Sequence, residues 1–337
     1  MGGWGVMRFF TKLLLLLMLL GAGVLGAGAW WLYAPMTLNL APGNAVLDLE
    51  IDVGTRAAQV AEAVVASGVD TPVQLLQLWF RASGQARQIK AGSYEITSGT
   101  TPHSLLAMLV RGDQALKSVT LVEGWTFNQV RAALQKAELL ATDSIGLQPE
   151  IIMEKLGRAG LHPEGRFFPD TYTYAKGSSD LAVLKRAAKA MDKRLQAAWA
   201  LRAPDTPLKS AEQALILASI VEKETGKASD RAQIAGVFSN RLRIGMRLQT
   251  DPTVIYGMGG AFDGNIRKRD LQTDTPYNTY TRAGLPPTPI AMPGKAALLA
   301  AVQSQPTKAL YFVARGDGSS EFSTTLDDHN RAVNKYI

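Results

Sequence analysis

The sequence predicts an α+β protein that follows a single membrane-spanning helix. Three observations support this: a long apolar run near the N-terminus, a strand–turn–helix pattern that recurs in the first half, and amphipathic helices mixed with short strands in the second. The chain has 337 residues, enough for two ordinary domains, and 47% of them are hydrophobic while 19% are charged, which is typical of a folded protein rather than a disordered one.

The first segment has the composition of a membrane span. Residues 13–33 carry no charged side chain, and this length matches the roughly 20 residues that a helix needs to cross a bilayer. Arg8 and Lys12 precede the run, and the next basic residue is Arg56. Because basic residues accumulate on the cytoplasmic side, we expect residues 1–12 to be a cytoplasmic tail and the rest of the chain to lie outside the cytoplasm.

A cleaved signal peptide is the alternative for this segment. The sequence Ala-Gly-Ala at residues 27–29 has the small-x-small form of a cleavage site, but the apolar run is longer than a usual signal-peptide core. The length therefore favours a retained anchor. An aromatic belt at the outer interface would be formed by Trp30, Trp31 and Tyr33.

A small strand–helix module is expected directly after the anchor. Residues 34–46 are rich in Pro and Gly and predict a short linker. A strand, a glycine turn, a hydroxyl N-cap and an amphipathic helix then recur three times, with turns at Gly54, Gly99 and Gly124, and the third copy opens the next domain. The spacing is irregular, which argues against a repeat array. We therefore expect one compact module over residues 47–117 and a larger α+β domain over residues 118–337.

The larger domain is expected to contain helices and one hairpin. Residues 248–291 are rich in Pro, Gly, Asn, Thr and Tyr and predict a long irregular loop, and a loop of this length is usually functional. The predicted elements are a helix over residues 180–201, a helix ending at Glu224, a helix from Asp230 to a stop at Gly245, a helix opened by Pro293, a hairpin joining residues 310–315 to 321–323, and a terminal helix.

Composition excludes several kinds of site. The chain has no cysteine, so it forms no disulfide framework and no thiolate metal site. The spacing of its three histidines, His103, His162 and His329, is not that of metal ligands. We therefore predict neither a metal nor a cofactor. No Ser-His-Asp set, phosphate loop or dinucleotide motif is present. The net charge of +7, on a domain outside the cytoplasm, indicates an anionic polymer or lipid headgroup rather than nucleic acid.

Glu224 is the leading candidate for a proton donor. It continues the apolar helical stripe of Leu217 and Val221, whereas Glu222 points roughly 200° away around the helix. Gly226 follows as a potential left-handed cap, which places Glu224 in the last turn. Both the helix dipole and burial against the stripe there favour the protonated acid. The alternative is that both acids belong to a solvated helix end.

The irregular stretch supplies polar and aromatic groups of the kind that a sugar site needs, because rings pack on the CH faces of sugars and amides bind the hydroxyls. A turn at residues 167–172 carries similar aromatic and polar side chains. The alternative is that these side chains serve turns and packing, with Asp251 capping the segment before Pro252. Three other acids compete with Glu224 for the role of proton donor: Glu123, Glu164 and Asp170. The candidate substrate-binding residues are Gln249, Asp251, Tyr277, Asn278, Tyr280 and Asp170.

Seven motifs occur in order along the chain: Glu-Gly at 123–124, Phe-Pro-Asp-Thr-Tyr at 168–172, residues 218–225 with Glu-Lys-Glu-Thr, Val-Phe-Ser-Asn-Arg-Leu at 237–242, Leu-Gln-Thr-Asp-Pro-Thr-Val-Ile-Tyr-Gly at 248–257, Tyr-Asn-Thr-Tyr at 277–280 and Gly-Leu-Pro-Pro at 284–287. Together they resemble the endolytic murein transglycosylase family, also called YceG-like or MltG. The resemblance spans nearly everything after the anchor.

The resemblance implies a lyase of the bacterial cell wall. The expected protein has one span in the inner membrane, a LysM-like module over residues 47–117, and a periplasmic catalytic domain that cuts peptidoglycan glycan strands internally. The family's catalytic glutamate falls on Glu224. It would protonate the oxygen between N-acetylmuramic acid and N-acetylglucosamine and then deprotonate the muramyl C6 hydroxyl, which closes a 1,6-anhydro ring. Dipoles from Gln249, Asn278 and Tyr280 would stabilise the positive charge of the sugar.

Two other functions remain open from the sequence. A muramidase would use a second carboxylate, Asp170 or Glu123, and would leave a reducing end. A catalytically silent anchor would hold peptidoglycan through the LysM-like module alone. The tether also suggests the hypothesis that the protein ends nascent glycan chains beside the peptidoglycan synthases at the membrane.

Overall fold

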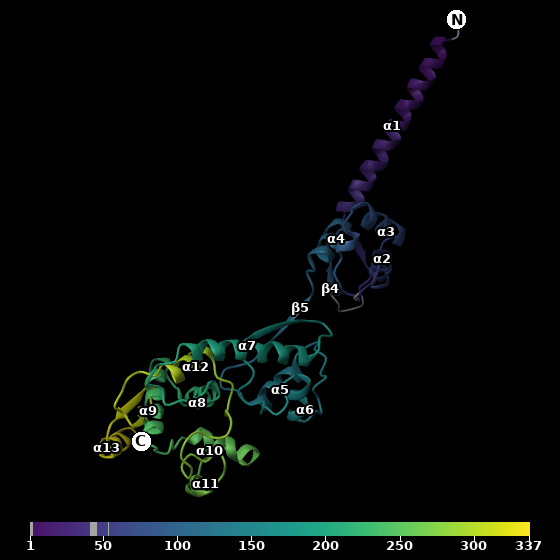
Figure 1. The fold of residues 1–337 in the computed structure, drawn as a ribbon. Coiled ribbons are helices and arrows are strands. Elements are labelled where there is room, and N and C mark those ends of the chain that lie inside the picture. Colours follow the sequence, from purple (N-terminus) through teal and green to yellow (C-terminus); the bar gives the residue numbers. More distant parts are fainter. Residues whose placement is uncertain (1–2, 41–45, 53) are drawn as a thin grey trace. The chain divides into compact units, whose positions relative to one another are not determined.

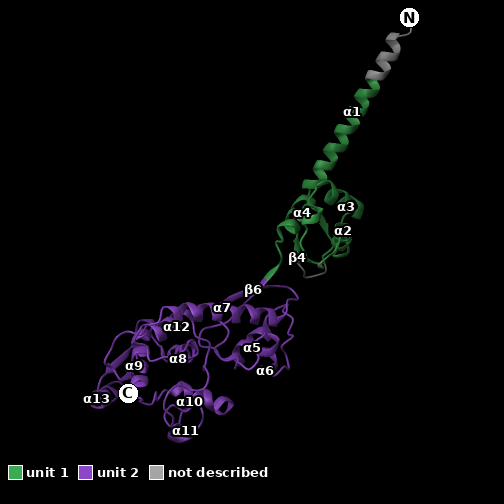
Figure 2. Ribbon diagram, in the orientation of Figure 1, with its two compact units in different colours: residues 1–116 green, residues 117–337 purple. Residues whose placement is uncertain are grey.

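The computed structural model describes residues 3–40, 46–52 and 54–337, which form two compact units, residues 1–116 and 117–337 (Figure 2). Side chains are described from Lys12 onward. Residues 41–45 of the predicted linker and Val53 in the first predicted glycine turn lie outside the described residues. The predicted α+β class is confirmed: helices dominate, and the described strands pair into four two-stranded sheets (Figure 1).

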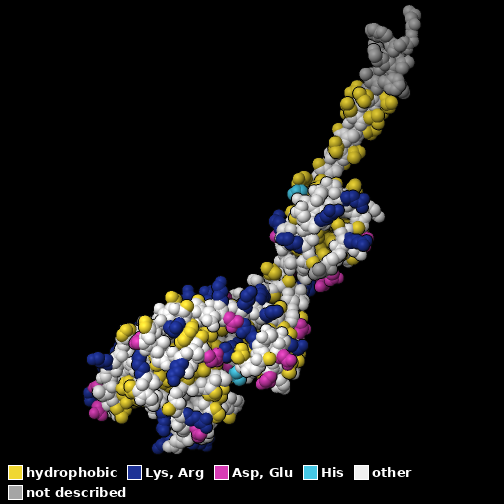
Figure 3. Space-filling view, in the orientation of Figure 1, with side chains coloured by type: hydrophobic (Ala, Val, Ile, Leu, Met, Phe, Trp, Pro, Cys, Tyr) yellow, Lys and Arg dark blue, Asp and Glu magenta, His cyan; other side chains and the backbone are white. Residues whose placement is uncertain are grey.

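Unit 1 consists of one long apolar helix and a small strand–helix module. Lys12–Tyr33, within α1, is long and apolar enough to cross a membrane, and hydrophobic side chains cover its described part (Figure 3). In the module, β1 pairs with β3 and β2 with β4, both antiparallel. The elements of the unit are α1 (Gly3–Tyr33), β1 (Thr37–Leu38), β2 (Val46–Ile51), α2 (Ala57–Ala66), β3 (Val69–Asp70), α3 (Val73–Ala82), the 3-10 turn η1 (Ala86–Gln88), β4 (Gly92–Thr97) and α4 (Pro102–Arg111).

The module encloses its own hydrophobic core. The inner faces of α2, α3 and α4 pack on the β2–β4 pair around the fully buried Phe80, Tyr94 and Leu105. The helix caps differ from the expected repeat. The Thr101 side chain accepts a hydrogen bond from the backbone of Ser104 and so caps α4, whereas α2 follows Arg56, whose own side chain does not cap the helix and whose backbone N–H donates to the Gln59 side chain at 3.1 Å.

Unit 2 contains two hydrophobic cores. The first surrounds α8, which packs against α7, α9 and α12; the second lies under α5, α6 and the first half of α7. The elements are β5 (Leu116–Thr120), α5 (Phe127–Lys136), α6 (Pro149–Lys155), β6 (Thr171–Ala175), α7 (Asp180–Ala200), α8 (Ala211–Glu224), η2 (Ala228–Asp230), α9 (Arg231–Arg243), α10 (Asp251–Met258), η3 (Gly259–Ala261), α11 (Lys268–Gln272), α12 (Lys295–Val302), β7 (Tyr311–Ala314), β8 (Ser320–Ser323) and α13 (Leu326–Tyr336).

The structure corrects three of the expectations for unit 2. The predicted irregular stretch contains the helices α10 and α11, which are too short to show a clear helical period in the sequence. Gly226 is not a left-handed cap: α8 ends at Glu224, and its C-cap is Thr225, whose hydroxyl and backbone N–H both donate to the carbonyl of Val221. Asp230 precedes α9, but its carboxylate accepts from the backbone of Ser320 instead of capping the helix.

Candidate active site

Glu224 is the last residue of α8 and lies on its predicted face. Leu217 and Val221, two turns and one turn earlier, are fully buried, and Glu224 itself is half-buried. Glu222 lies on another face, where its carboxylate accepts a hydrogen bond from the backbone N–H of Gly294 at 2.9 Å. The two acids therefore have separate surroundings, as the helical period predicts.

Glu224 borders a cavity of about 460 Å³. Elements that are far apart in the sequence form it: the end of α8, the last turn of α9, the turn before α10 with the first residue of that helix, the loop after α11, β7 and the first half of α13. Three of the predicted substrate-binding residues line it together with Glu224. The other lining residues were not predicted. The complete lining is Glu224, Arg241, Gln249, Asp251, Tyr280, Tyr311, Phe312, Leu326, His329 and Asn330.

A buried threonine cluster holds the Glu224 carboxyl group. The Thr250 hydroxyl donates to Oε1 of Glu224. The backbone N–H of Thr250 donates to the Thr279 hydroxyl at 3.1 Å, and the hydroxyls of Thr279 and Thr253 are 2.9 Å apart. All three threonines are at most 2% exposed, so the donor to Glu224 is fixed in place. Sequence reasoning missed Thr250, although it lies in the Leu-Gln-Thr-Asp-Pro-Thr motif.

The surroundings of Glu224 favour its protonated form. Burial raises the pKa of Glu224, and the nearby Asp251 raises it further, while the Thr250 hydrogen bond and the charge of Arg241 lower it. Arg241, itself buried, donates to the carbonyl oxygens of Leu248 at 2.6 Å and Leu310 at 2.7 Å. Its positive charge is therefore held near the carboxyl by the backbone. The Asn-Arg-Leu motif contained this residue without revealing its role.

Gln249 and Asp251 flank Thr250 and both reach the cavity. Gln249 is in the left-handed region with φ of 49°, which is uncommon for a residue other than glycine. Its backbone N–H donates to the carbonyl of Thr279 at 3.1 Å, which holds this conformation. Asp251 is the first residue of α10, and its carboxylate accepts a hydrogen bond of 2.6 Å from the hydroxyl of Tyr280.

Asn278 and Tyr277 have contacts inside the protein. The fully buried amide of Asn278 donates to the carbonyls of Asp270, Leu271 and Thr273, and its oxygen accepts from the backbone of Tyr280. Asn278 therefore shapes the loop that carries Tyr280. The hydroxyl of Tyr277 is 2.8 Å from that of Thr288.

A second cavity, of about 740 Å³, lies beside Tyr277 and the rival acid Glu164. Glu164 is 3% exposed and accepts from the backbone N–H of Phe127 at 3.0 Å, at the start of α5. Burial raises the pKa of Glu164 to about 7. The walls include aromatic rings, and those of Tyr256 and Tyr277 pack edge to face at 4.9 Å.

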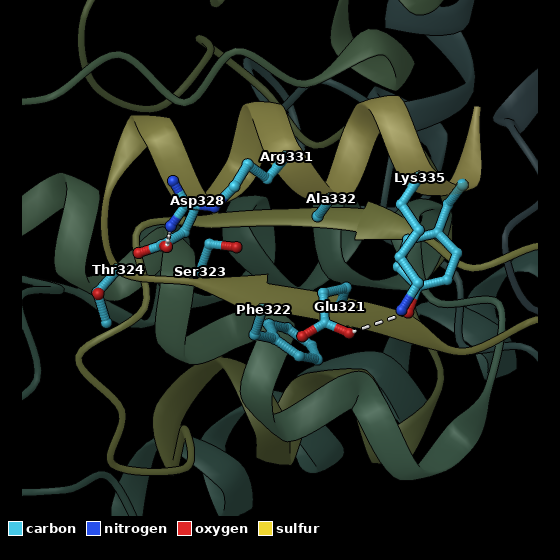
Figure 4. Close-up of a pocket in the computed structure, with 9 residues that line it drawn as sticks. Glu321, Phe322, Ser323, Thr324, Asp328, Arg331, Ala332 and Lys335 are labelled. Carbon is cyan, nitrogen blue, oxygen red and sulfur yellow. Dashed lines mark hydrogen bonds and ion pairs between the residues drawn. The ribbon is translucent and has the colours of Figure 1, made fainter.

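The other acids lie elsewhere. Asp170 is exposed, and its carboxylate accepts from the backbone of Thr171. Glu123 lies against Gly294, beside Glu222. A third cavity, over β8 and α13, is lined by charged side chains that already pair with one another, such as Asp328 with Arg331 (Figure 4). Among the described residues, no three His, Asp or Glu side chains are placed to hold a metal ion.

Comparison with known proteins yields a consistent set of relatives. The sequence profile of the YceG-like family matches residues 49–335. An endolytic murein transglycosylase of Bacillus subtilis is 30% identical over 308 residues, covering 86% of this chain and 85% of the relative. The endolytic murein transglycosylase of Streptococcus pneumoniae is 28% identical over 283 residues, covering 74% of this chain but 51% of the relative. This chain therefore spans about half the length of the Streptococcus protein.

A solved structure agrees with these relatives. The crystal structure of a yceG-like protein from Listeria monocytogenes aligns with a TM-score of 0.53 and 27% sequence identity, and the alignment covers 85% of this chain and 98% of that one. The motifs quoted from the sequence all lie within the matched residues 49–335.

Proposed function

The chain belongs to the YceG-like family, and from that premise we propose that it is a peptidoglycan lytic transglycosylase with Glu224 as its acid and base. One observation carries the assignment. Glu224 is a half-buried carboxyl with a raised pKa, held by a fixed hydroxyl and open to a polar cavity. A general acid must keep its proton at neutral pH and still reach the substrate, and this arrangement meets both needs.

The reaction needs one carboxyl group acting twice. Protonated Glu224 donates to the oxygen that joins N-acetylmuramic acid to N-acetylglucosamine, and the bond from that oxygen to muramyl C1 breaks. The carboxylate then takes the proton of the C6 hydroxyl while O6 bonds to C1, which closes the 1,6-anhydro ring. No water enters the products, so the reaction is that of a lyase.

The residues around the cavity support each stage. After the first proton transfer, Glu224 is a half-buried anion, which the Thr250 hydroxyl and the charge of Arg241 stabilise. The positive charge that develops on the sugar ring would be stabilised by the Glu224 carboxylate, by Asp251 and by the side-chain dipole of Gln249, all of which line the same cavity.

A two-carboxylate muramidase is the alternative that the cavity favours most. Asp251 is a second acid on its wall, whereas Asp170 and Glu123 are not among the residues that line it. If Asp251 activated a water molecule, the products would carry reducing ends instead of anhydro rings. Because Asp251 accepts the Tyr280 hydroxyl, it already has a partner in the cavity wall, which supports a positioning role.

The apolar helix supports a location at the cell membrane. We propose that residues 13–33 of the apolar helix span the inner membrane with residues 1–12 in the cytoplasm, that the module of unit 1 and the whole of unit 2 lie in the periplasm, and that the module of unit 1 is the LysM-like module. A cutter held there reaches newly made strands first. We therefore also propose that it ends nascent glycan chains beside the peptidoglycan synthases.

Product analysis tests the proposal. The purified full chain in detergent micelles is incubated with uncross-linked glycan strands, and the ends are identified by mass spectrometry for wild type, Glu224→Gln and the matched control Glu222→Gln. We expect anhydro ends from wild type and from Glu222→Gln, and none from Glu224→Gln. Hydrated, reducing ends would establish a muramidase, and binding to sacculi without shortening of the strands would establish a silent anchor.

A further inference from the structure

Helix α3 in unit 1 is apolar on two of its faces. Leu76 and Phe80 point into the core of the module and are fully buried. A second stripe, at the helical spacing of three and four residues, faces outward, with Leu75 40% and Leu78 62% exposed. Apolar side chains therefore cover more of α3 than its packing on the core of the module buries, so this outer stripe indicates a missing cover. The outer stripe consists of Leu75, Leu78, Trp79 and Ala82.

The outer stripe faces the apolar helix α1. The two helices enclose a groove of about 520 Å³. Its lining contains no charged side chain: Val24, Leu25, Gly28, Ala29, Trp31 and Leu32 come from α1, and Leu75, Leu78, Trp79 and Ala82 come from α3. The only polar group on the α3 side is the indole N–H of Trp79, and it already donates to the carbonyl of Pro102 at 3.1 Å. The groove therefore suits an apolar occupant.

Contacts within unit 1 fix α1 against the module. The ring of Tyr33 lies 5.0 Å from the ring of His103 on α4, and the backbone N–H of Met36 donates to the carbonyl of Thr100 at 2.9 Å. Trp31 packs against the core of the module. The groove is thus a feature of one compact unit.

The groove extends to the depth of the bilayer if α1 crosses it. The 22 residues of Lys12–Tyr33 form a helix of about 33 Å, close to the hydrocarbon thickness of about 30 Å. Val24 precedes Tyr33 by two and a half turns, which places it about 13 Å inside the outer end of the span. Val24 and Leu25 are 72% and 75% exposed, so lipid must cover them. The outer stripe of α3 borders the same groove.

We propose that the outer stripe of α3 is a lipid-binding surface that is inserted in the outer leaflet of the membrane, with phospholipid acyl chains filling the groove between α3 and α1. The inference rests on α1 spanning the membrane. A second copy of the chain fits less well, because the groove is continuous with the exposed side chains of the span and no boundary separates the two. The module is therefore held on the bilayer surface at two points.

Site-directed spin labelling tests this on the full chain in phosphatidylglycerol–phosphatidylcholine vesicles. Because the chain has no cysteine, single labels can be placed without other changes. The test position is Leu78→Cys, which is exposed in the module and so leaves its core intact. Leu25→Cys on α1 gives the lipid reference and Glu50→Cys on β2 the water reference, and Arg81→Cys is the matched control on the polar side of α3.

Collisions with oxygen, which concentrates in lipid, and with a water-soluble nickel chelate give the depth of each label. We expect the label at 78 to follow the one at 25, with an oxygen-to-nickel ratio at least ten times that at 50, and the label at 81 to fall between them. A label at 78 as accessible to nickel as the one at 50 overturns the proposal. Protection from both reagents overturns it too, because it shows a protein cover.

The same experiment tests separately the premise that α1 spans the membrane. If the label at Leu25→Cys is itself accessible to nickel, α1 does not span the membrane. Catalytic activity is not measured in this experiment, so its result is independent of the proposed lytic function.

Discussion

Glu224 and Glu164 are two carboxyl groups of unit 2 that burial affects in the same direction. Glu224 ends α8, and Glu164 accepts the first backbone N–H of α5. Burial is the largest cause of the raised pKa in both cases. Each also borders a cavity. By burial and acidity alone, the two would be equal candidates for a catalytic acid.

The two carboxyl groups differ in the groups that form hydrogen bonds with them. Glu164 receives a backbone hydrogen bond at a helix start and a second one from the Tyr256 hydroxyl, so it joins α5 to α10 as a structural cap. Glu224 is held by one threonine hydroxyl at the base of a polar cavity. A raised pKa therefore locates buried acids, and the hydrogen-bond partners distinguish a catalytic role from a structural one.

The largest expected effect is on the rate of strand cleavage. Glu224→Gln should lose a factor of about 10² to 10⁴, the usual contribution of a general acid and base. Glu164→Gln, corrected for the folded fraction, should stay within about tenfold of wild type, because it touches no reacting atom. Initial rates of release of new glycan ends measure both. Equal losses in the two variants would remove the distinction drawn here.

The second effect concerns the stability of the fold, which we expect to depend more on Glu164 than on Glu224. The pKa of Glu164 rises from 4.5 to about 7 on folding, so the folded state binds the proton more tightly. Stability from this group is fully present below pH 4.5 and is lost as the pH rises to about 7, a change of about 3 kcal/mol. Glu164→Gln keeps a neutral acceptor for Phe127 and should remove this dependence. Urea unfolding of the full chain in micelles at pH 5 and pH 8 measures it, and parallel pH profiles for variant and wild type would contradict it.

A third, smaller effect is a shift in the pH dependence of activity. Activity should fall as the pH rises through the raised pKa of Glu224, because the acid loses its proton. Asp251 raises that pKa and the Thr250 hydroxyl lowers it, so Asp251→Asn should move the alkaline limb to lower pH and Thr250→Val to higher pH. Profiles of kcat/KM measure the limb. If the alkaline limb shifted in the same direction in both variants, the geometry of the site rather than its charges would control the position of the limb.

The smallest effect is expected at Glu222. In Glu222→Gln the amide oxygen can still accept from the backbone N–H of Gly294, so both fold and rate should change by less than about threefold. The variant uses the same helix and the same chemical change as Glu224→Gln, two residues away. A loss as large as that of Glu224→Gln would move the catalytic assignment to the face of Glu222 and Glu123.

Local sequence patterns predicted the long elements well. The apolar period placed α7 within one residue of its observed end, and the glycine-rich turn at 316–318 placed the β7–β8 hairpin. Expectations failed where an element was short or had an alternative partner. The helices α10 and α11 carry at most two turns, and the carboxylate of Asp230 binds the distant Ser320 rather than its own helix.

The candidate site was predictable only in part. Helical spacing identified the face of Glu224, and loop composition identified Gln249, Asp251 and Tyr280, which the structure brings to the same cavity. Arg241 and Thr250 were missed because their roles depend on contacts with chain segments far away in the sequence. Asn278 was named for its amide, but its partners are backbone carbonyls that no side-chain pattern reveals.

The wall of the Glu224 cavity on α13 has a consequence for how the molecule matures. Leu326, His329 and Asn330 come from a helix that is synthesised long after the one that carries the acid. During synthesis, Glu224 therefore leaves the ribosome before this part of its enclosure does. The cavity beside Glu224 is therefore complete only after α13 has been made and has packed in place, so an unfinished chain carries the acid without its finished site.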